Sequence, residues 1–267
     1  MNALDPILKR TRSAVARRRA SVPLDEVQAA AAQRTARDPV RPLRPVLAGP
    51  GLAIIAEHKR RSPSAGLIRD DLELEDVVSA YERGGAAALS VLTEADSFGG
   101  SLDDLRRARA ASSLPILRKD FIVDAYQVTE ARAAGADVIL LIVAALAPQE
   151  LHELHAHARA EGLATLVEVH DAAELEIAVA LEPEVIGINN RDLTTLEVDI
   201  NRTLALRPQV PAGILVVAES GFRARAELDR VAAAGVDGVL VGEALMRAGD
   251  IEAACRDLAG VSAGRAL

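Results

Sequence analysis

The sequence of 267 residues contains one cysteine, Cys255, and no tryptophan. A single cysteine excludes an internal disulfide framework and a metal cluster built on cysteines. Three phenylalanines and two tyrosines offer few stacking platforms for single-stranded nucleic acid. No apolar run approaches the roughly 20 residues of a membrane span, and residues 1–19 lack the apolar centre of a secretory signal. We therefore expect a soluble, cytoplasmic protein without nucleic-acid or membrane partners.

Charge is distributed unevenly along the chain. Residues 1–50 contain ten lysine or arginine and four aspartate or glutamate residues, a balance of +6 that leaves −14 for residues 51–267. Because an acidic body repels phosphate backbones, we interpret the basic arm as a solvated helical face rather than as a nucleic-acid site.

Lysine is scarce among the basic residues. Only three of the 31 are lysines, namely Lys9, Lys59 and Lys119. Arginine stays protonated whereas an ammonium group titrates, so a lysine retained in an arginine-rich chain is a candidate for proton transfer. Lys9 lies in the basic arm and is expected to be solvated, which leaves Lys59 and Lys119 as candidates for chemistry.

Short apolar runs alternate with segments of helical periodicity from residue 51 to residue 260. The helical segments include 70–83, 101–112, 124–134, 148–161 and 223–234, and four intervals place a glycine, a common helix-ending residue, before the next apolar run. Eight βα units predict an α/β fold that is a single closed (β/α)8 TIM barrel, and no G-x-G-x-x-G follows the first run to indicate an open dinucleotide-binding sheet. The predicted strands are 52–56, 87–92, 115–117, 137–143, 163–167, 185–188, 214–218 and 238–241.

The two ends of the chain stand outside this repeat. Residues 1–45 predict an N-terminal helical extension, broken around Val22-Pro23 and ended by the proline-rich stretch at 38–45. Residues 46–260 would form the barrel, and 261–267 would be a frayed C-terminal tail.

Polar residues follow almost every predicted strand. Glu57 and Lys59 end the first strand on one side by alternation, and His58 points to the helix shell. Later strands lead into RKDF, VEVH, INNRDL, AESGF and VGEAL. In a parallel barrel the catalytic groups gather where strands end. So many charged groups at one rim cost desolvation free energy unless they form ion pairs or take part in catalysis. The pattern predicts an active site at this rim.

Taken in order, these motifs resemble one enzyme family. IAEHKRRSPSAG, SVLTEADSFGGSLDDL, ILRKDFIVDAYQV, LVEVH, GINNRDL, ESGF and VGEALM are similar to successive motifs of the indole-3-glycerol phosphate synthase family. The resemblance implies a (β/α)8 barrel with an N-terminal helical extension. It also implies a carboxy-lyase of tryptophan biosynthesis that uses no cofactor and no metal.

The reaction implied by the resemblance closes a ring in 1-(o-carboxyphenylamino)-1-deoxyribulose 5-phosphate. The aryl carbon that bears the carboxylate attacks the ribulose carbonyl, and loss of CO2 and water gives indole-3-glycerol phosphate. An acid must neutralise the developing oxyanion, and dehydration needs a base and an acid. Two alternatives stay open: another phosphate-binding barrel, such as phosphoribosylanthranilate isomerase, and a non-catalytic scaffold. The expected partner is a small phosphorylated substrate, and the expected state is a monomer or a weak homo-oligomer.

The resemblance also implies roles for single residues. Lys119 matches the principal general acid, and Glu168 matches the base. Lys59 matches a second lysine, which holds the substrate carboxylate or donates a proton, and the step in which each lysine acts stays open. The other implied catalytic residues are Glu57, an acidic partner of the lysines, and Asn189, which orients intermediates. The implied substrate-binding residues are Phe98 and Phe121 for the ring, Arg191 for the carboxylate, and Ser62, Ser220, Gly221, Gly242 and Glu243 for the phosphate.

Other candidate sites fail on spacing or position. His152, Glu153 and His155 fall one residue short of the H-E-x-x-H zinc motif and, with His157, are expected to decorate a helix surface. Cys255 lies in a late alanine-rich helix away from the rim, and G-x-S-x-G is absent, so we expect no nucleophile of either kind.

Overall fold

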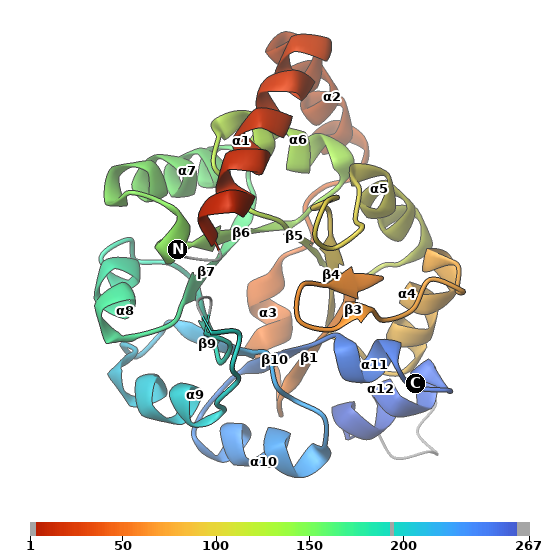
Figure 1. The fold of residues 1–267 in the computed structure, drawn as a ribbon, viewed down its shortest axis with the longest axis vertical. Helices are drawn as coiled ribbons and strands as arrows, with labels where there is room; N and C mark the ends of the chain where they lie inside the picture. Colours follow the sequence, from red (N-terminus) through yellow and green to blue (C-terminus); the bar gives the residue numbers. More distant parts are fainter. Residues whose placement is uncertain (1–3, 193–194, 261–267) are drawn as a thin grey trace.

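The barrel predicted from the sequence is present in the computed structural model, which describes residues 4–192 and 195–260 (Figure 1). Eight parallel strands close in the order β1-β10-β9-β8-β7-β6-β5-β4. Ala53 of β1 lies opposite Gly238 of β10, and Ile55 lies opposite Ala88 of β4, which completes the ring. Every predicted strand is accounted for. The strands are β1 (Ala53–His58), β4 (Ala88–Leu92), β5 (Ile116–Lys119), β6 (Val138–Ile142), β7 (Ala164–Val169), β8 (Val185–Asn189), β9 (Leu215–Glu219) and β10 (Gly238–Val241).

The helices surround the barrel on its outside (Figure 1). The five expected helical segments are found as α4 (Leu74–Arg83), α5 (Leu102–Ala111), α6 (Ala125–Ala134), α7 (Pro148–Ala160) and α10 (Arg225–Ala233). Shorter elements escaped prediction because one or two turns carry little periodicity. Among the described residues, no helix is both long and apolar enough to cross a membrane. The remaining elements of the barrel region are β2 (Arg61–Ser62), β3 (Gly66–Leu67), α8 (Ala172–Val179), α9 (Asn201–Leu206), α11 (Glu243–Met246), α12 (Ile251–Ala259) and the 3₁₀ turns η1 (Val143–Ala145) and η2 (Arg207–Gln209).

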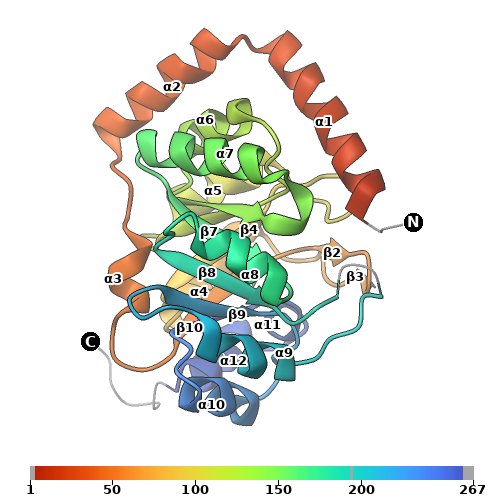
Figure 2. The same ribbon diagram turned by 90° about the vertical axis from the view of Figure 1, so that its left-hand side faces the viewer.

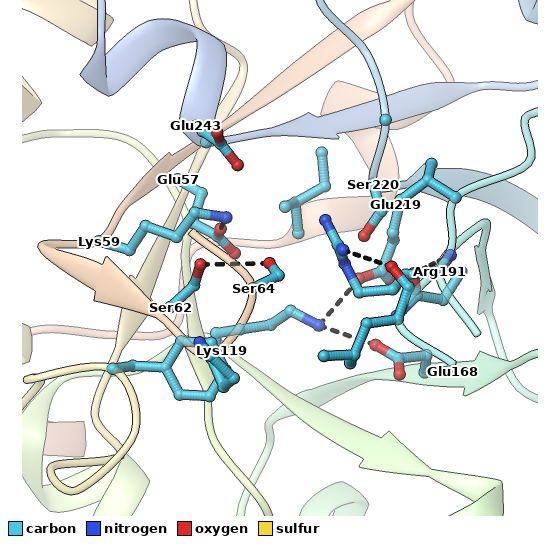
Figure 3. A pocket seen from close by; sticks show the side chains of 18 of the residues that line it. Glu57, Lys59, Ser62, Ser64, Lys119, Glu168, Arg191, Glu219, Ser220 and Glu243 are labelled. Carbon is cyan, nitrogen blue, oxygen red and sulfur yellow. Dashed lines mark hydrogen bonds and ion pairs between the residues drawn. The ribbon is translucent and has the colours of Figure 1, made fainter. Parts of the chain in front are cut away.

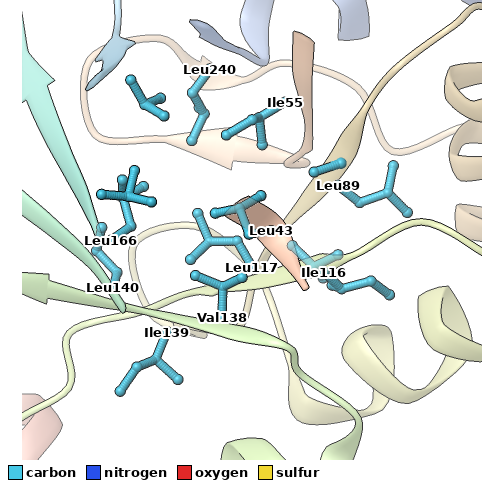
Figure 4. Packing of buried hydrophobic residues seen from close by; sticks show 14 of the residues in the cluster. Leu43, Ile55, Leu89, Ile116, Leu117, Val138, Ile139, Leu140, Leu166 and Leu240 are labelled. Carbon is cyan, nitrogen blue, oxygen red and sulfur yellow. The ribbon is translucent and has the colours of Figure 1, made fainter. Parts of the chain in front are cut away.

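Aliphatic side chains fill the barrel interior (Figure 4). Successive strand residues face opposite sides, so Leu117, Leu140, Leu166 and Leu240 point inward, and each is at most 5% exposed. Both faces of every strand are covered, which explains why the strands read as nearly continuous aliphatic runs. This packed layer forms the floor beneath the polar carboxyl ends of the strands.

Three helices precede the barrel: α1 (Leu4–Ser21), α2 (Leu24–Arg37) and α3 (Leu43–Leu47). The break that was predicted at Val22-Pro23 separates α1 from α2, which together form an inverted V above α6 and α7 (Figure 2).

Helix α3 lies at the amino-terminal end of the barrel. Its Leu47 is 1% exposed and sits so close to β10 that a Cβ on Gly238 would lie 2.8 Å from Leu47 Cδ2. Residue 45, where we predicted the extension to end, falls inside α3, and that domain boundary stays a prediction. The predicted tail at 261–267 lies outside the described residues.

One sequence-based expectation about α7 is wrong. His155 is buried at 6% exposure, and its Nδ1 lies 2.9 Å from Thr165 Oγ1 on β7. The reason is helical geometry: His155 follows Leu151 by four residues and therefore shares its inward face. His152 and Glu153 are exposed, as expected, and Cys255 is buried in α12.

A buried ion-pair cluster fastens the segment between α2 and α3 to the barrel. Arg109 Nη1 lies 2.8 and 2.7 Å from the two carboxylate oxygens of Asp137, and Arg109 Nε donates to Asp38 Oδ2 at 2.6 Å. Asp137 also accepts the backbone N–H groups of Arg41 and Ile116, each at 2.8 Å. The hydrogen bond from Arg109 lowers the pKa of Asp38 from 3.8 to about 2. The cluster lies at the amino-terminal end of the barrel, opposite the carboxyl ends of the strands, and residues at that end of a barrel serve stability.

We expect Asp38→Asn to lower the free energy of unfolding by about 2 kcal/mol at pH 7, because the ion pair favours the folded state in proportion to the pKa shift. The folded-state pKa is depressed, so the contribution is present above pH 4 and is lost as the pH falls toward 2. Urea unfolding at pH 7 and pH 3 measures the difference, with the exposed Asp25→Asn as control. A deficit that stays equally large at pH 3 would contradict this account.

Candidate active site

A cavity of about 800 Å³ opens at the carboxyl ends of the barrel strands (Figure 3). Its size suits a small-molecule ligand. The structure brings every residue predicted for the site to the wall of this one cavity. They are Glu57, Lys59, Ser62, Phe98, Lys119, Phe121, Glu168, Asn189, Arg191, Ser220, Gly221, Gly242 and Glu243.

Lys119, at the end of β5, lies between two carboxylates (Figure 3). Its Nζ donates to Glu168 Oε2 on β7 at 2.8 Å and to Glu219 Oε2 on β9 at 2.9 Å. Both carboxylate side chains are 2% exposed, whereas that of Lys119 is 15% exposed. One ammonium group therefore serves two buried carboxylates, and its charge cannot neutralise both.

The pKa values of the three groups reflect this imbalance. Burial works against the ammonium form, but Glu168 and Glu219 outweigh it and hold the pKa of Lys119 well above the usual lysine value. Burial raises the pKa of Glu219 to about 7, and the neighbouring Glu168 adds to the rise. For Glu168, Lys119 and His170 outweigh burial and lower the pKa. At neutral pH, Lys119 is protonated, Glu168 is ionised and Glu219 is close to its midpoint, which suits acid–base chemistry.

A second ion pair lies at the end of β1. Lys59 Nζ is 2.8 Å from Glu57 Oε1, and Ser90 Oγ on β4 donates to Glu57 Oε2 at 3.3 Å. Gly242 leaves room for this carboxylate, since a Cβ there would lie 2.6 Å from Glu57 Oε1. His58 points the other way as predicted and is 3% exposed, and burial lowers its pKa to about 4. His58 is therefore a neutral, packed side chain.

The first loop folds into the β2–β3 hairpin, which carries Ser62 at the cavity wall. Ser62 Oγ accepts the backbone N–H of Ala65 at 3.2 Å, a local contact that shapes the turn. Arg60 ties the hairpin to α5 through two hydrogen bonds to Asp104, at 2.8 and 2.7 Å.

The loop after β8 holds Asn189 and Arg191. Asn189 Oδ1 accepts the backbone N–H of Arg191 at 3.0 Å, and Arg191 Nη1 donates to the carbonyl of Leu196 at 2.9 Å. The loop thus fixes the Arg191 guanidinium at the cavity wall.

The loops after β9 and β10 supply backbone rather than side-chain chemistry. Ser220 and Gly221 both have positive φ, at 68° and 92°, so the chain turns sharply where β9 ends. Glu243 opens α11, and its carboxylate pairs with Arg247 at 3.0 Å. Because a carboxylate repels an anion, only the backbone N–H of Glu243 is a candidate ligand for one.

Comparison with known proteins identifies the family of the chain. The family model described as "Indole-3-glycerol phosphate synthase" matches residues 4–258. The chain belongs to the indole-3-glycerol phosphate synthase family. It is 47% identical to the indole-3-glycerol phosphate synthase of Rhodopirellula baltica, over 97% of this chain and 99% of that protein. It is 49% identical to that of Burkholderia vietnamiensis, over 94% and 96% of the two chains.

One solved structure of low sequence identity resembles the chain in fold alone. A 3-hexulose-6-phosphate synthase from Salmonella typhimurium superposes with a TM-score of 0.63 at 14% identity, over 78% of this chain and 97% of the other. Identity this low supports the barrel architecture and carries nothing about chemistry.

Sequence reasoning gave no role to two parts of this family site. Glu219 was visible in the AESGF motif, where alternation places it inside the barrel with Val217, but its partner Lys119 is 100 residues away in the sequence. Leu4 and Arg10 of α1 also line the cavity. No local signal marks them, because their position depends on how α1 docks across the barrel.

Within the part of the chain that the structure describes, no group of three or more histidine, cysteine, aspartate or glutamate side chains has the arrangement of a metal site. Glu57 is paired instead with Lys59, and Glu168 and Glu219 share Lys119.

Gly187 on β8 is expected to be essential for placing Glu219, because a Cβ at residue 187 would overlap Glu219 Oε1. Gly187→Ala should displace the carboxylate and lower kcat about 100-fold, the usual scale for a displacement near 1 Å in an active site. Steady-state turnover and the melting temperature would be measured together. Gly249→Ala is the control, because that glycine has open space around it and no positive φ, and normal turnover in Gly187→Ala would contradict the packing argument.

Proposed function

We propose that the chain catalyses the ring closure of 1-(o-carboxyphenylamino)-1-deoxyribulose 5-phosphate to indole-3-glycerol phosphate, CO2 and water. The observation that carries the proposal is the placement of Lys119 between Glu168 and Glu219 at the barrel mouth. The family match over residues 4–258 supports the same activity.

Lys119 is proposed to act as the acid for ring closure. Its ammonium group is protonated at neutral pH and partly exposed to the cavity, so it can donate to the carbonyl oxygen as the new carbon–carbon bond forms. The carboxylates behind it keep the proton in place until that oxygen becomes basic.

Glu168 is proposed to remove the proton that must leave before the indole becomes aromatic. Its pKa is lowered and it is almost fully buried, so it is ionised and held in a fixed position. Lys59 and Glu57 form a separate pair on the opposite side of the barrel mouth, where Lys59 can hold the substrate carboxylate or protonate the departing hydroxyl.

The substrate is proposed to lie with its phosphate at the loops after β9 and β10 and its ring between apolar groups. Ser220, Gly221, Gly242 and the backbone of Glu243, with Ser62 across the cavity, would bind the phosphate. Phe98 and Phe121 would pack on the aryl ring, while Arg191 would bind the carboxylate and Asn189 would orient the intermediates.

The rival functions explain less of the site. A phosphate-binding isomerase needs the loops after β9 and β10 but has no use for the E-x-K, K-D-F and V-E-V-H set. A non-catalytic scaffold would gain nothing from three buried carboxylates around the lysines, since buried charges cost stability unless they are used.

The direct test is turnover of the substrate by the purified protein. Indole fluorescence should appear without added cofactor, and at an unchanged rate in the presence of EDTA. Absence of an indole product with correctly folded protein would overturn the proposed function.

A pair of substitutions at Lys119 tests its role as an acid. Lys119→Met should lower kcat by roughly 10²–10⁴-fold with little change in substrate affinity, the usual scale for one acid–base group. Lys119→Arg keeps the charge but hardly releases a proton, so a severe loss is expected there as well. Lys9→Met, at an exposed position of α1, is the control. Turnover within threefold of wild type in Lys119→Met would refute the assignment, and near-normal turnover in Lys119→Arg would indicate a purely electrostatic role.

A further inference from the structure

His170 is a buried titratable group that the proposed mechanism leaves without a role. It follows β7 directly, two residues after Glu168, and is 9% exposed. A histidine buried to this degree needs partners for its ring nitrogens.

The two ring nitrogens of His170 face two different carboxylates. Nδ1 lies 3.0 Å from Glu174 Oε2 on α8, and the same oxygen accepts the backbone N–H of His170 at 2.8 Å. Glu174 therefore holds both the ring and the backbone of His170. Nε2 lies 3.4 Å from Glu168 Oε1, and among the described residues this buried nitrogen has no hydrogen-bond partner. The free side of the ring is thus directed at the carboxylate oxygen that Lys119 does not contact.

These contacts join five side chains of alternating charge. The row runs from Glu174 through His170, Glu168 and Lys119 to Glu219. Lys119 contacts both inner carboxylates at nearly the same distance, so it cannot by itself distinguish them. Of these two carboxylates, His170 contacts only that of Glu168. Glu219 Oε1 is buried and has no hydrogen-bond partner among the described residues.

We infer that His170, held as an imidazolium by Glu174, is a positioning residue that makes Glu168 rather than Glu219 the ionised base of the site. The inference rests on the proposed function only where it calls Glu168 the base of the reaction. The arrangement of charges around His170 does not depend on that function. The positive charge of His170 lies beside Glu168 and favours its ionised form. A proton shared by Glu168 and Glu219 is therefore held by Glu219.

The charged groups around His170 support a protonated ring. Glu174 faces it from α8 and Glu168 from β7, and behind Glu168 lie Lys119 on β5 and Glu219 on β9. Burial works against the imidazolium, but the two carboxylates that face it outweigh burial and raise the pKa of His170 from 6.5 to about 9. The positive charge is therefore present below pH 9 and is lost above it, and kcat should fall as the pH rises through about 9.

The test is the pH profile of kcat in His170→Gln, which keeps an amide donor near the Nε2 position but removes the charge. Without the charge, the proton that Glu219 binds near pH 7 is shared with Glu168, and the pair binds it more tightly. The acid limb of the profile should therefore move up by about one pH unit, and the fall near pH 9 should disappear. At pH 7 kcat should drop about tenfold, with KM within about twofold of wild type. The matched control is His155→Gln, a buried histidine of α7 that contacts Thr165 on the outer face of β7, whose profile should equal that of wild type. An unchanged acid limb in His170→Gln would overturn the inference.

A second measurement keeps the inference separate from the proposed function and from misfolding. Titration of ¹³C-labelled histidine side chains by NMR, in wild type and in Glu174→Gln, needs no turnover. His170 should titrate near pH 9 in wild type and at clearly lower pH in Glu174→Gln, and the acid limb of kcat should shift in the same direction as in His170→Gln. Titration of His170 near 6.5 in the wild-type protein would overturn the inference even if the enzyme is active. Failure of the wild-type protein to form indole would instead overturn the proposed function.

Discussion

The structure of the site follows from one constraint, which is that the three carboxylates around Lys59 and Lys119 are buried at one end of a barrel otherwise filled with aliphatic side chains. Each must be matched by a cation or keep its proton, because an unpaired buried charge costs several kcal/mol. Lys59 matches Glu57, and Lys119 matches Glu168. Glu219 shares Lys119 and meets the constraint in the second way, since its pKa lies near neutrality. The arrangement that makes burial tolerable also places a proton donor beside proton acceptors.

The same constraint shapes the backbone around the site. Gly187 on β8 and Gly242 after β10 lie where a Cβ would collide with Glu219 and Glu57, so these two positions make room for carboxylates rather than for turns. Packing around charged groups, and not only around the aliphatic core, therefore restricts which residues the strands can hold. Natural proteins depart from regular core packing mainly at functional sites, and both glycines lie at the end of the barrel that carries the candidate active site.

The two ends of the barrel handle buried charge in different ways. At the amino-terminal end, Arg109 is fully surrounded by Asp137 and Asp38, and α3 closes the opening. Arg109 is paired there with both carboxylates, and the pairing ties the segment between α2 and α3 to the barrel. At the carboxyl end Lys119 is shared by Glu168 and Glu219, and all three side chains line the cavity. Stability and chemistry are thus separated along the barrel axis, as the fold allows.

The sequence alone was sufficient for the barrel and for thirteen residues of the cavity wall, although it gave no role to Glu219 or to α1. Eight apolar runs with intervening helical periodicity determine a parallel closed sheet, and parallel strands bring their carboxyl ends to one rim, so residues as distant as Glu57 and Glu243 could be assigned to one cavity. Tertiary structure alone decided which partners these residues have. Periodicity can place Glu219 inside the barrel and His155 on the inward face of its helix. It does not show that Glu219 contacts Lys119 or that His155 contacts Thr165, since those contacts join separate strands and helices. The approach of α1 to the cavity likewise depends on packing between Val15, Val27 and Tyr126, a contact among three helices that no local pattern encodes.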